Sequence, residues 1–149
     1  MIKLYKKIFI YLLLILLVTG CSKIKQKDNN EESNNIEVIS SMKIEINSNE
    51  YIINLEQNET VSELTKLLPL EITMNELNGN EKYANIDKSL PTNSFYPDRI
   101  NKGDVYLFGN DCIVIFYESF VPDYSYTKIG HIDNLPNLGN GNIKVRFYK

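Results

Sequence analysis

The segment from Gly103 to Gly130 constrains the fold of this chain more than any other. Two runs of apolar, β-branched and aromatic residues, Val105–Phe108 and Cys112–Tyr117, flank a turn at Gly109–Asp111. Short apolar runs separated by glycine-containing turn residues predict a β-hairpin. The second run is unbroken in its hydrophobicity, which is typical of a strand that is covered on both faces.

This predicted hairpin leads into a polar loop rich in tyrosine, Glu118–Tyr126, and then into a third strand-like run, Thr127–Ile132. Recognition residues are often carried on loops that a rigid scaffold positions. We therefore expect the buried strands to form such a scaffold and the tyrosine-rich loop to contribute to a recognition surface.

Further strands are predicted on both sides of this segment. Met42–Ile46 and Tyr51–Leu55 are expected to pair across a turn at Asn47–Glu50, and Leu70–Met74 is expected to form a third strand. Ile143–Tyr148 alternates apolar and polar residues, which is the period of a strand with one buried face. It is predicted to close the sheet.

One main helix is predicted, from about residue 60 to residue 68. Thr60-Val61-Ser62-Glu63 matches the capping box, in which the Thr hydroxyl and the Glu carboxylate bind free backbone N–H groups. The apolar residues of this stretch then share one helical face: Val61, Leu64, Leu67 and Leu68. Pro69 is expected to end the helix, because proline restricts the residue before it and lacks a backbone donor.

The stretch Asn75–Asn101 is predicted to be long and mostly irregular, and such stretches in compact domains are often functional. Short strands with one helix indicate a mainly β fold. We expect an antiparallel barrel or sandwich in which the helix covers an open end or a face.

The amino end is predicted to be a processing segment, residues 1–20, that takes no part in the fold. It combines early lysines with an apolar run, Ile8–Val18, that is shorter than the roughly 20 residues of a membrane-spanning helix. The run ends in Val18-Thr19-Gly20-Cys21, which resembles the lipobox of bacterial lipoproteins. The alternative is an uncleaved amino-terminal anchor, and both interpretations place the rest of the chain outside the cytoplasm.

The lipobox resemblance implies that the Cys21 thiol receives a diacylglyceryl group and that the chain is cut before this cysteine. Acyl chains such as palmitate then anchor the protein, since two or more chains hold a protein stably on a membrane. Residues 21–41 are rich in Asn, Lys, Glu and Ser, and we expect a disordered tether there. Met42–Lys149 leaves 108 residues, enough for one domain with one core.

The charge of the mature chain argues against a nucleic-acid partner. The leader holds three of the 16 basic residues and none of the 19 acidic ones, so the remainder carries a net charge of −6. Proteins that bind nucleic acids or anionic membrane surfaces usually carry a basic patch instead. The oligomeric state stays open at this stage.

Cysteine and histidine are too few for most site chemistry. With Cys21 assigned to the lipid, Cys112 has no partner for an intramolecular disulfide, and we interpret it as a small buried apolar residue. His131 is the single histidine and has no Cys or His at metal-ligand spacing. We expect it to be a hydrogen-bonded structural residue, and we predict no metal, no cofactor and no catalytic residue.

Several stretches, in this order, resemble the bacterial cyclophilin-like proteins, a group of small domains with a cyclophilin-type β-barrel. The stretches are Leu68-Pro69-Leu70 with a strand ending at Met74, Glu81-Lys82-Tyr83, Leu90-Pro91, Gly103-Asp104-Val105-Tyr106-Leu107, Ile115-Phe116-Tyr117, and Tyr124-Ser125-Tyr126-Thr127 with Ile129-Gly130. The resemblance covers essentially all of Met42–Lys149. It implies a closed or nearly closed antiparallel barrel.

The resemblance does not extend to the isomerase motif of true cyclophilins. That motif has the form F-H-R-x-I-x-x-F-M, is followed by Q-G-G-D, and uses its arginine to steady the twisting amide. This chain has only Arg99 and Arg146 as arginines and contains no tryptophan. Gly103-Asp104 is similar to the family's G-D step but opens a predicted hairpin strand.

If the barrel has a cleft where its relatives have one, we expect seven residues to bind a ligand there. They are Met74, Glu81, Tyr83, Arg99, Phe116, Tyr124 and Tyr126. The leading hypothesis is a non-catalytic module for a small molecule or an extended peptide. The alternatives are a diverged peptidyl-prolyl isomerase for exported proteins, with Arg99 at the amide, and an interaction protein that uses a sheet edge or the tyrosine-rich loop.

Overall fold

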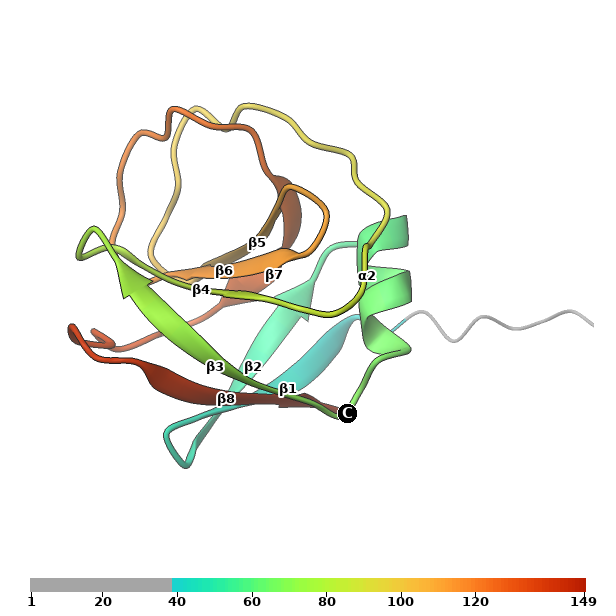
Figure 1. The fold of residues 1–149 in the computed structure, drawn as a ribbon, viewed down its shortest axis with the longest axis horizontal. Helices are drawn as coiled ribbons and strands as arrows, with labels where there is room; N and C mark the ends of the chain where they lie inside the picture. Colours follow the sequence, from blue (N-terminus) through green and yellow to red (C-terminus); the bar gives the residue numbers. More distant parts are fainter. Residues whose placement is uncertain (1–38) are drawn as a thin grey trace, which may run out of the picture. The chain divides into compact units, whose positions relative to one another are not determined.

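The computed structural model describes residues 39–149, so the predicted leader, Cys21 and all but the last residues of the tether lie outside the described residues. Residues 41–148 form a closed antiparallel barrel with strand order β1-β2-β7-β5-β6-β4-β3-β8 and one helix (Figure 1). The elements are β1 (Ser41–Ile46), β2 (Asn49–Leu55), α2 (Glu59–Thr65), β3 (Leu70–Leu77), β4 (Glu81–Asn85), β5 (Asp104–Phe108), β6 (Cys112–Phe116), β7 (Thr127–Ile132) and β8 (Ile143–Tyr148). The predicted fold class, a mainly β closed barrel with one helix, is confirmed.

The predicted hairpins form, but the first turn is tighter than expected. β1 and β2 are joined by Asn47 and Ser48 alone, with φ angles of 48° and 69°. Positive φ at both central residues is the geometry of the two-residue turns whose twist matches that of the paired strands. Asn49 and Glu50, which were assigned to the turn, are therefore the first residues of β2.

The prediction that Asn75–Asn101 is mostly irregular is wrong for its first part. β3 continues to Leu77, turns through Asn78 and Gly79 with φ angles of 56° and 71°, and pairs with β4. Asn-Gly is the strongest short hairpin signal, because both residues tolerate positive φ. The irregular stretch begins only after β4.

The helix is shorter than predicted and has a different cap. Its first residue is Glu59, and Asn58 is the N-cap, whose side-chain oxygen accepts from the Val61 backbone N–H at 2.9 Å. The Thr60 hydroxyl instead donates to the Pro91 carbonyl oxygen at 2.6 Å. The capping-box prediction is therefore wrong, because a tertiary hydrogen bond takes the hydroxyl that the motif would use. The helix ends at Thr65.

Two apolar clusters lie on opposite sides of the barrel wall. The interior cluster is mostly aliphatic and includes Ile44, Ile53, Ile113, Ile115 and Phe147. The outer cluster lies on β4, β5 and β6 and consists of Ile100, Tyr106, Cys112, Val114, Phe116 and Tyr126, with Tyr83 and Phe120 against it. Every residue of β6 is buried, so the predicted two-sided burial of this strand is confirmed.

Two loops cover the outer cluster, the stretch from residue 86 to 103 and the stretch from residue 117 to 126 (Figure 1). They pair with each other through reciprocal backbone hydrogen bonds between Phe95 and Tyr126, and between Ile100 and Phe120. This pairing fixes the tyrosine-rich loop beside the barrel wall. Within residues 39–149, no helix has the length and hydrophobicity needed to cross a membrane.

Candidate binding groove

The candidate site begins with the alternation of side chains on β4. Glu81, Tyr83 and Asn85 lie on the outer face, whereas Lys82 and Ala84 are buried. In an antiparallel pair, residues directly opposite each other share a face. Glu81 lies opposite Phe116 and Tyr83 lies opposite Val114, so the outer face of β4 continues the outer apolar cluster across β6.

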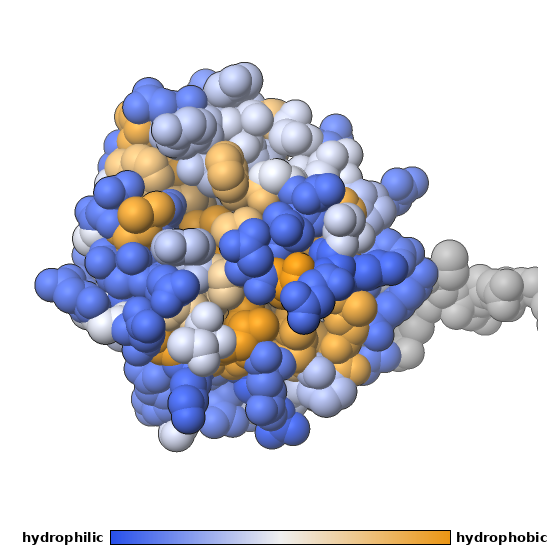
Figure 2. All heavy atoms as spheres, viewed as in Figure 1, coloured by the Kyte–Doolittle hydropathy of each residue, from blue (hydrophilic) through white to orange (hydrophobic). Residues whose placement is uncertain are grey.

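Between this face and the tyrosine-rich loop lies a groove of about 780 Å³, here called the outer groove. It is larger than two other hollows, of about 590 and 650 Å³. Its aromatic lining residues are Tyr83, Phe108, Phe120, Tyr124 and Tyr126, and its polar ones include Asn78, Asn80, Glu81, Asn85, Asp111 and Asp123. Figure 2 shows apolar surface at several places among the polar side chains, with smaller patches at the upper left and the strongest in the middle and at the lower right of the view.

The structure brings four of the seven predicted site residues together. Glu81, Tyr83, Tyr124 and Tyr126 line the outer groove. Tyr124 is 62% exposed and Tyr126 is 5% exposed, so the two tyrosines form an accessible rim and a buried wall. Phe108 packs against both rings: it lies edge to face with Tyr124 at 5.8 Å between centroids, and tilted against Tyr126 at 5.6 Å.

The other three predicted residues lie elsewhere. Phe116 is fully buried in the outer cluster beneath the groove, where its ring packs 5.6 Å from that of Tyr126. Met74 is fully buried in the interior cluster, on the other side of the barrel wall. Arg99 is exposed and is not among the residues that line the groove.

The outer groove is electronegative. Glu81, Asp111 and Asp123 line it, and its lining contains no lysine, arginine or histidine. Burial, followed by the nearby charge of Glu76, raises the pKa of the Glu81 carboxyl. No ion pair to Glu81 is present in the described part of the chain. This carboxylate is therefore a partly desolvated anion without a counter-charge.

The neighbouring lysine does not neutralise Glu81. Lys82 is fully buried, and its ammonium donates to the carbonyl oxygens of Gly139 (2.5 Å) and Gly141 (2.7 Å). It also lies 5.0 Å from the centroid of the Tyr117 ring. The alternation of side chains along β4 therefore places the Lys82 ammonium on the opposite face of the strand from the groove. Burial lowers the pKa of Lys82.

The groove holds no activated nucleophile. Burial, with the charges of Asp111 and Glu81, raises the pKa of the Cys112 thiol to about 11, so it stays protonated at neutral pH. Burial and the charge of Glu81 raise the pKa of Tyr126 to about 12. These groups are suited to packing and hydrogen bonding.

One buried acceptor in the groove lining lacks a partner. Asn80 Oδ1 is buried and has no hydrogen bond within the described residues, although Asn80 lines the groove. The backbone carbonyl of Asn80 is satisfied, because it accepts from the Tyr117 N–H at 2.9 Å. Buried polar atoms are rarely left unpaired, so this oxygen is an exception among the described residues.

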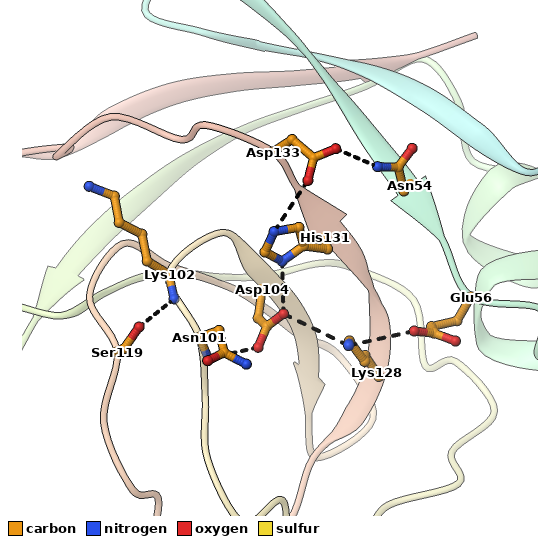
Figure 3. A network of polar contacts seen from close by, with 9 residues as sticks. All are labelled: Asn54, Glu56, Asn101, Lys102, Asp104, Ser119, Lys128, His131 and Asp133. Carbon is orange, nitrogen blue, oxygen red and sulfur yellow. Dashed lines mark hydrogen bonds and ion pairs between the residues drawn. The ribbon is translucent and has the colours of Figure 1, made fainter.

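A separate polar network surrounds His131 (Figure 3). His131 Nδ1 lies 2.9 Å from Asp104 Oδ1, and Nε2 lies 3.6 Å from Asp133 Oδ1. The other Asp104 oxygen, Oδ2, accepts from the Asn101 N–H at 2.8 Å, and Lys128 Nζ lies 3.8 Å from Oδ1. The interpretation of His131 as a hydrogen-bonded residue is thus confirmed, with an aspartate partner that no sequence motif indicated.

This network fixes the base of one covering loop. The Asp104 side chain is 3% exposed and ties β5 to β7 and to Asn101. Gly103, before it, has φ of 96°, and a Cβ there would lie 2.3 Å from the Ile132 carbonyl oxygen. The Gly103-Asp104 step is therefore explained by close strand packing. Both His131 ring nitrogens face carboxylates. The nearby Ser119 hydroxyl accepts from the Lys102 backbone N–H.

Sequence reasoning missed several groove residues, chiefly Asn80, Phe108, Asp111 and Phe120. The Asn78-Gly79 dipeptide is a signal that would have found the β3–β4 hairpin, and with it the shared outward face of Glu81 and Tyr83. The pairing of β4 with β6 carries no comparable local signal.

The fold and the groove together define a class, a closed antiparallel β-barrel with a loop-covered groove on its outer wall. A family model, described as the cyclophilin-like family, matches residues 44–148, and this chain belongs to that family. The structure is similar to the solution structure of the hypothetical protein AF2241 from Archaeoglobus fulgidus, with a TM-score of 0.52 and 21% identity over 74% of this chain and 95% of that one. At that identity the likeness shows the fold alone. A search of curated proteins found no match.

The amino end matches a second model, a prokaryotic membrane lipoprotein lipid attachment site, over residues 6–22. The match contains Cys21, so the resemblance to the lipobox is confirmed. The protein is a lipid-anchored, extracytoplasmic membrane lipoprotein with a cyclophilin-like domain.

Proposed function

We propose that the protein is a binding module whose outer groove takes a small molecule or an extended peptide without catalysis. The observation that carries the proposal is the outer groove itself. It combines aromatic walls with a few converging polar groups, and ligand sites commonly have this composition. Its volume of about 780 Å³ falls within the usual range of such sites, roughly 300–1,000 Å³.

The geometry favours binding over the two alternatives. An isomerase would place an arginine at the amide, but Arg99 does not line the outer groove. A partner that adds a strand needs a free sheet edge, and the closed barrel gives each of β1 to β8 a neighbour on both sides, with only residues 49–52 of β2 left unpaired toward β7 among the β2–β7 contacts. The tyrosine-rich loop forms one wall of the groove, so its exposed rings belong to the same proposed site.

A thermal-shift screen of small molecules on the soluble chain from Ser22 tests this proposal. Ligand at about 100 times its Kd stabilises a protein by about 2.7 kcal/mol, an effect that is readily detected. Tyr124→Ala removes an exposed groove ring, and Tyr96→Ala removes an exposed ring that does not line the groove. We expect ligands to stabilise the wild type and Tyr96→Ala but not Tyr124→Ala. Ligands that stabilise all three proteins equally would place the site elsewhere.

A proline-isomerisation assay on the same chain tests the enzyme alternative. We expect no rate above the uncatalysed background. A rate that is present in the wild type and lost in Arg99→Ala would contradict the non-catalytic proposal.

We further propose that Cys21 carries the diacylglyceryl group and acyl chains such as palmitate, which hold the protein at the cell membrane. The lipid attachment site supports this assignment. Labelling cells with a palmitate analogue should mark the wild type and leave Cys21→Ala unmarked. Equal labelling of the variant would overturn the assignment.

A further inference from the structure

We propose that the ligand of the outer groove is an organic cation, an ammonium or guanidinium group on an apolar body. This inference rests on the proposed binding function and names the chemical class of ligand. It is drawn from the charges of the groove, from the geometry of its rings and from its unpaired acceptors.

The charges of the groove favour a cation. Glu81, Asp111 and Asp123 line it without a basic residue. Lys82, next to Glu81 in the sequence, is held inside the barrel by the Gly139 and Gly141 carbonyl oxygens. A positively charged ligand would supply the counter-charge that Glu81 lacks among the described residues. An anionic ligand would instead be repelled by the carboxylates of the groove.

The rings of the groove also favour a cation. The groove is lined by four rings in the same space as Glu81: Tyr83, Phe108, Tyr124 and Tyr126. Phe108, at the end of β5, packs against the rings of both Tyr124 and Tyr126. Aromatic faces attract ammonium and guanidinium groups within about 6 Å, and clusters of such rings recognise substituted ammonium ions. The apolar body of the ligand would cover the exposed parts of these rings, such as the 44% of Phe108 and 62% of Tyr124.

The hydrogen-bond acceptors of the groove also favour a cation. Within the described residues, Asn80 Oδ1 is a buried acceptor without a donor, and the ionised Glu81 carboxylate accepts hydrogen bonds but cannot donate them. An ammonium group has up to three donors and no acceptor, so it can pair with the Glu81 carboxylate without bringing an unpaired acceptor of its own. A neutral apolar ligand would leave the Glu81 carboxylate without a donor or a counter-charge.

The experiment compares three probes with the same apolar body on the soluble chain from Ser22. They are 4-phenylbutylammonium, neutral 4-phenylbutanol and anionic 4-phenylbutyrate, titrated at pH 7 by calorimetry and by two-dimensional NMR. We expect the ammonium probe to bind at least tenfold more tightly than the alcohol and the carboxylate probe not to bind. Equal affinity of ammonium and alcohol at the groove would overturn the cation inference and leave the proposed binding function standing. Absence of binding by all three would overturn both.

Matched variants assign the effect to the groove. Glu81→Gln keeps the shape of the side chain and removes its charge, and we expect it to weaken the ammonium probe about tenfold while leaving the alcohol unchanged. Glu71→Gln removes the same charge from a residue that pairs with Arg146 and does not line the groove, so we expect no change. Equal weakening by both variants would mean that the net charge of the protein, and not the groove, attracts the cation.

Two sources can present this chemistry, a free amine or a lysine or arginine side chain in a peptide. The blocked peptides acetyl-Gly-Phe-Lys-Gly-amide and acetyl-Gly-Phe-Glu-Gly-amide distinguish them. Binding of the lysine peptide at least as tightly as 4-phenylbutylammonium indicates a peptide ligand, and weaker binding indicates a free organic cation. Preference for the glutamate peptide would contradict the inference.

Discussion

The two faces of the β4–β6–β5 wall are built from different residues and serve different ends. The inner face places Ile113, Ile115, Val105 and Leu107 in an aliphatic cluster that is closed to solvent. The outer face places tyrosines, phenylalanines and Glu81 beneath loops that leave a groove. A closed aliphatic core contributes stability and little else, whereas partly exposed rings with hydroxyls and an unpaired carboxylate can recognise a ligand.

The inner face should respond most strongly to substitution. Ile115→Ala deletes a fully buried side chain of the central strand, and we expect a loss of about 3–4 kcal/mol in the free energy of unfolding. Urea unfolding measures it. Ile52→Ala is the matched control, since Ile52 is 55% exposed and should cost no more than about 0.5 kcal/mol. Similar losses for the two variants would mean that the interior is not the tightly packed face described here.

The buried carboxylate at the base of the loop should rank next. Asp104→Ala leaves His131, Lys128 and the Asn101 N–H without their shared partner, and we expect a loss of about 2–3 kcal/mol. Relative to the wild type, Asp104→Ala should accelerate hydrogen exchange more in residues 95–103 than in β8. A uniform increase across the barrel would show that Asp104 does not hold this loop specifically.

Glu81→Gln should act in the opposite direction from most substitutions. Because burial raises the pKa of Glu81, the ionised form costs free energy in the folded state, and removing the charge should stabilise the free protein at pH 7. The gain should stay below about 1 kcal/mol, since the groove is open to solvent. Below the ordinary carboxyl pKa of 4.5 it should vanish, because the wild type is then protonated in both states.

Melting curves of wild type and Glu81→Gln at several pH values measure this effect. Stabilisation of the variant at pH 7 together with weaker cation binding is the signature of a group retained for a ligand. Destabilisation that is equal at pH 7 and pH 4 would show that the Glu81 charge carries no such cost.

The smallest effect on stability is expected at the rim of the groove. Tyr124 is 62% exposed, so Tyr124→Ala should change the free energy of unfolding by no more than about 0.5 kcal/mol while lowering ligand affinity. Tyr124→Phe keeps the ring and should retain most of the affinity. A large loss of stability in Tyr124→Ala would show that Tyr124 contributes to the packed core, and would contradict the division into a stabilising inner face and a ligand-binding outer face.

Local sequence signals were enough for much of the fold. The unbroken apolar run of β6, the alternation in β8 and the glycine-containing turn before β6 each depend on neighbouring residues, and these strands form as predicted. The helix shows the limit of this reasoning, because Asn58 and Thr60 are both good capping residues. The contact of Thr60 with the distant Pro91 carbonyl decides between them.

The site depended more heavily on contacts between distant residues. The outward face of Glu81 and Tyr83 follows from a turn that the sequence does signal, at Asn78-Gly79. Their position beside Tyr124 follows from the pairing of β4 with β6 and of the two loops, which no local pattern specifies. Met74 has the residue type of a ligand wall, but the alternation along β3 places it inside the barrel.

The most direct test of the account is to map ligand contacts on the tyrosine rings. In NMR spectra of the soluble chain with labelled tyrosines, 4-phenylbutylammonium should shift the ring signals of Tyr83, Tyr124 and Tyr126. The rings of Tyr51 and Tyr148, on strands that do not line the outer groove, should stay unchanged. Shifts confined to Tyr51 or Tyr148, or no shifts at saturating probe, would contradict the claim that the outer face of this wall is the binding site.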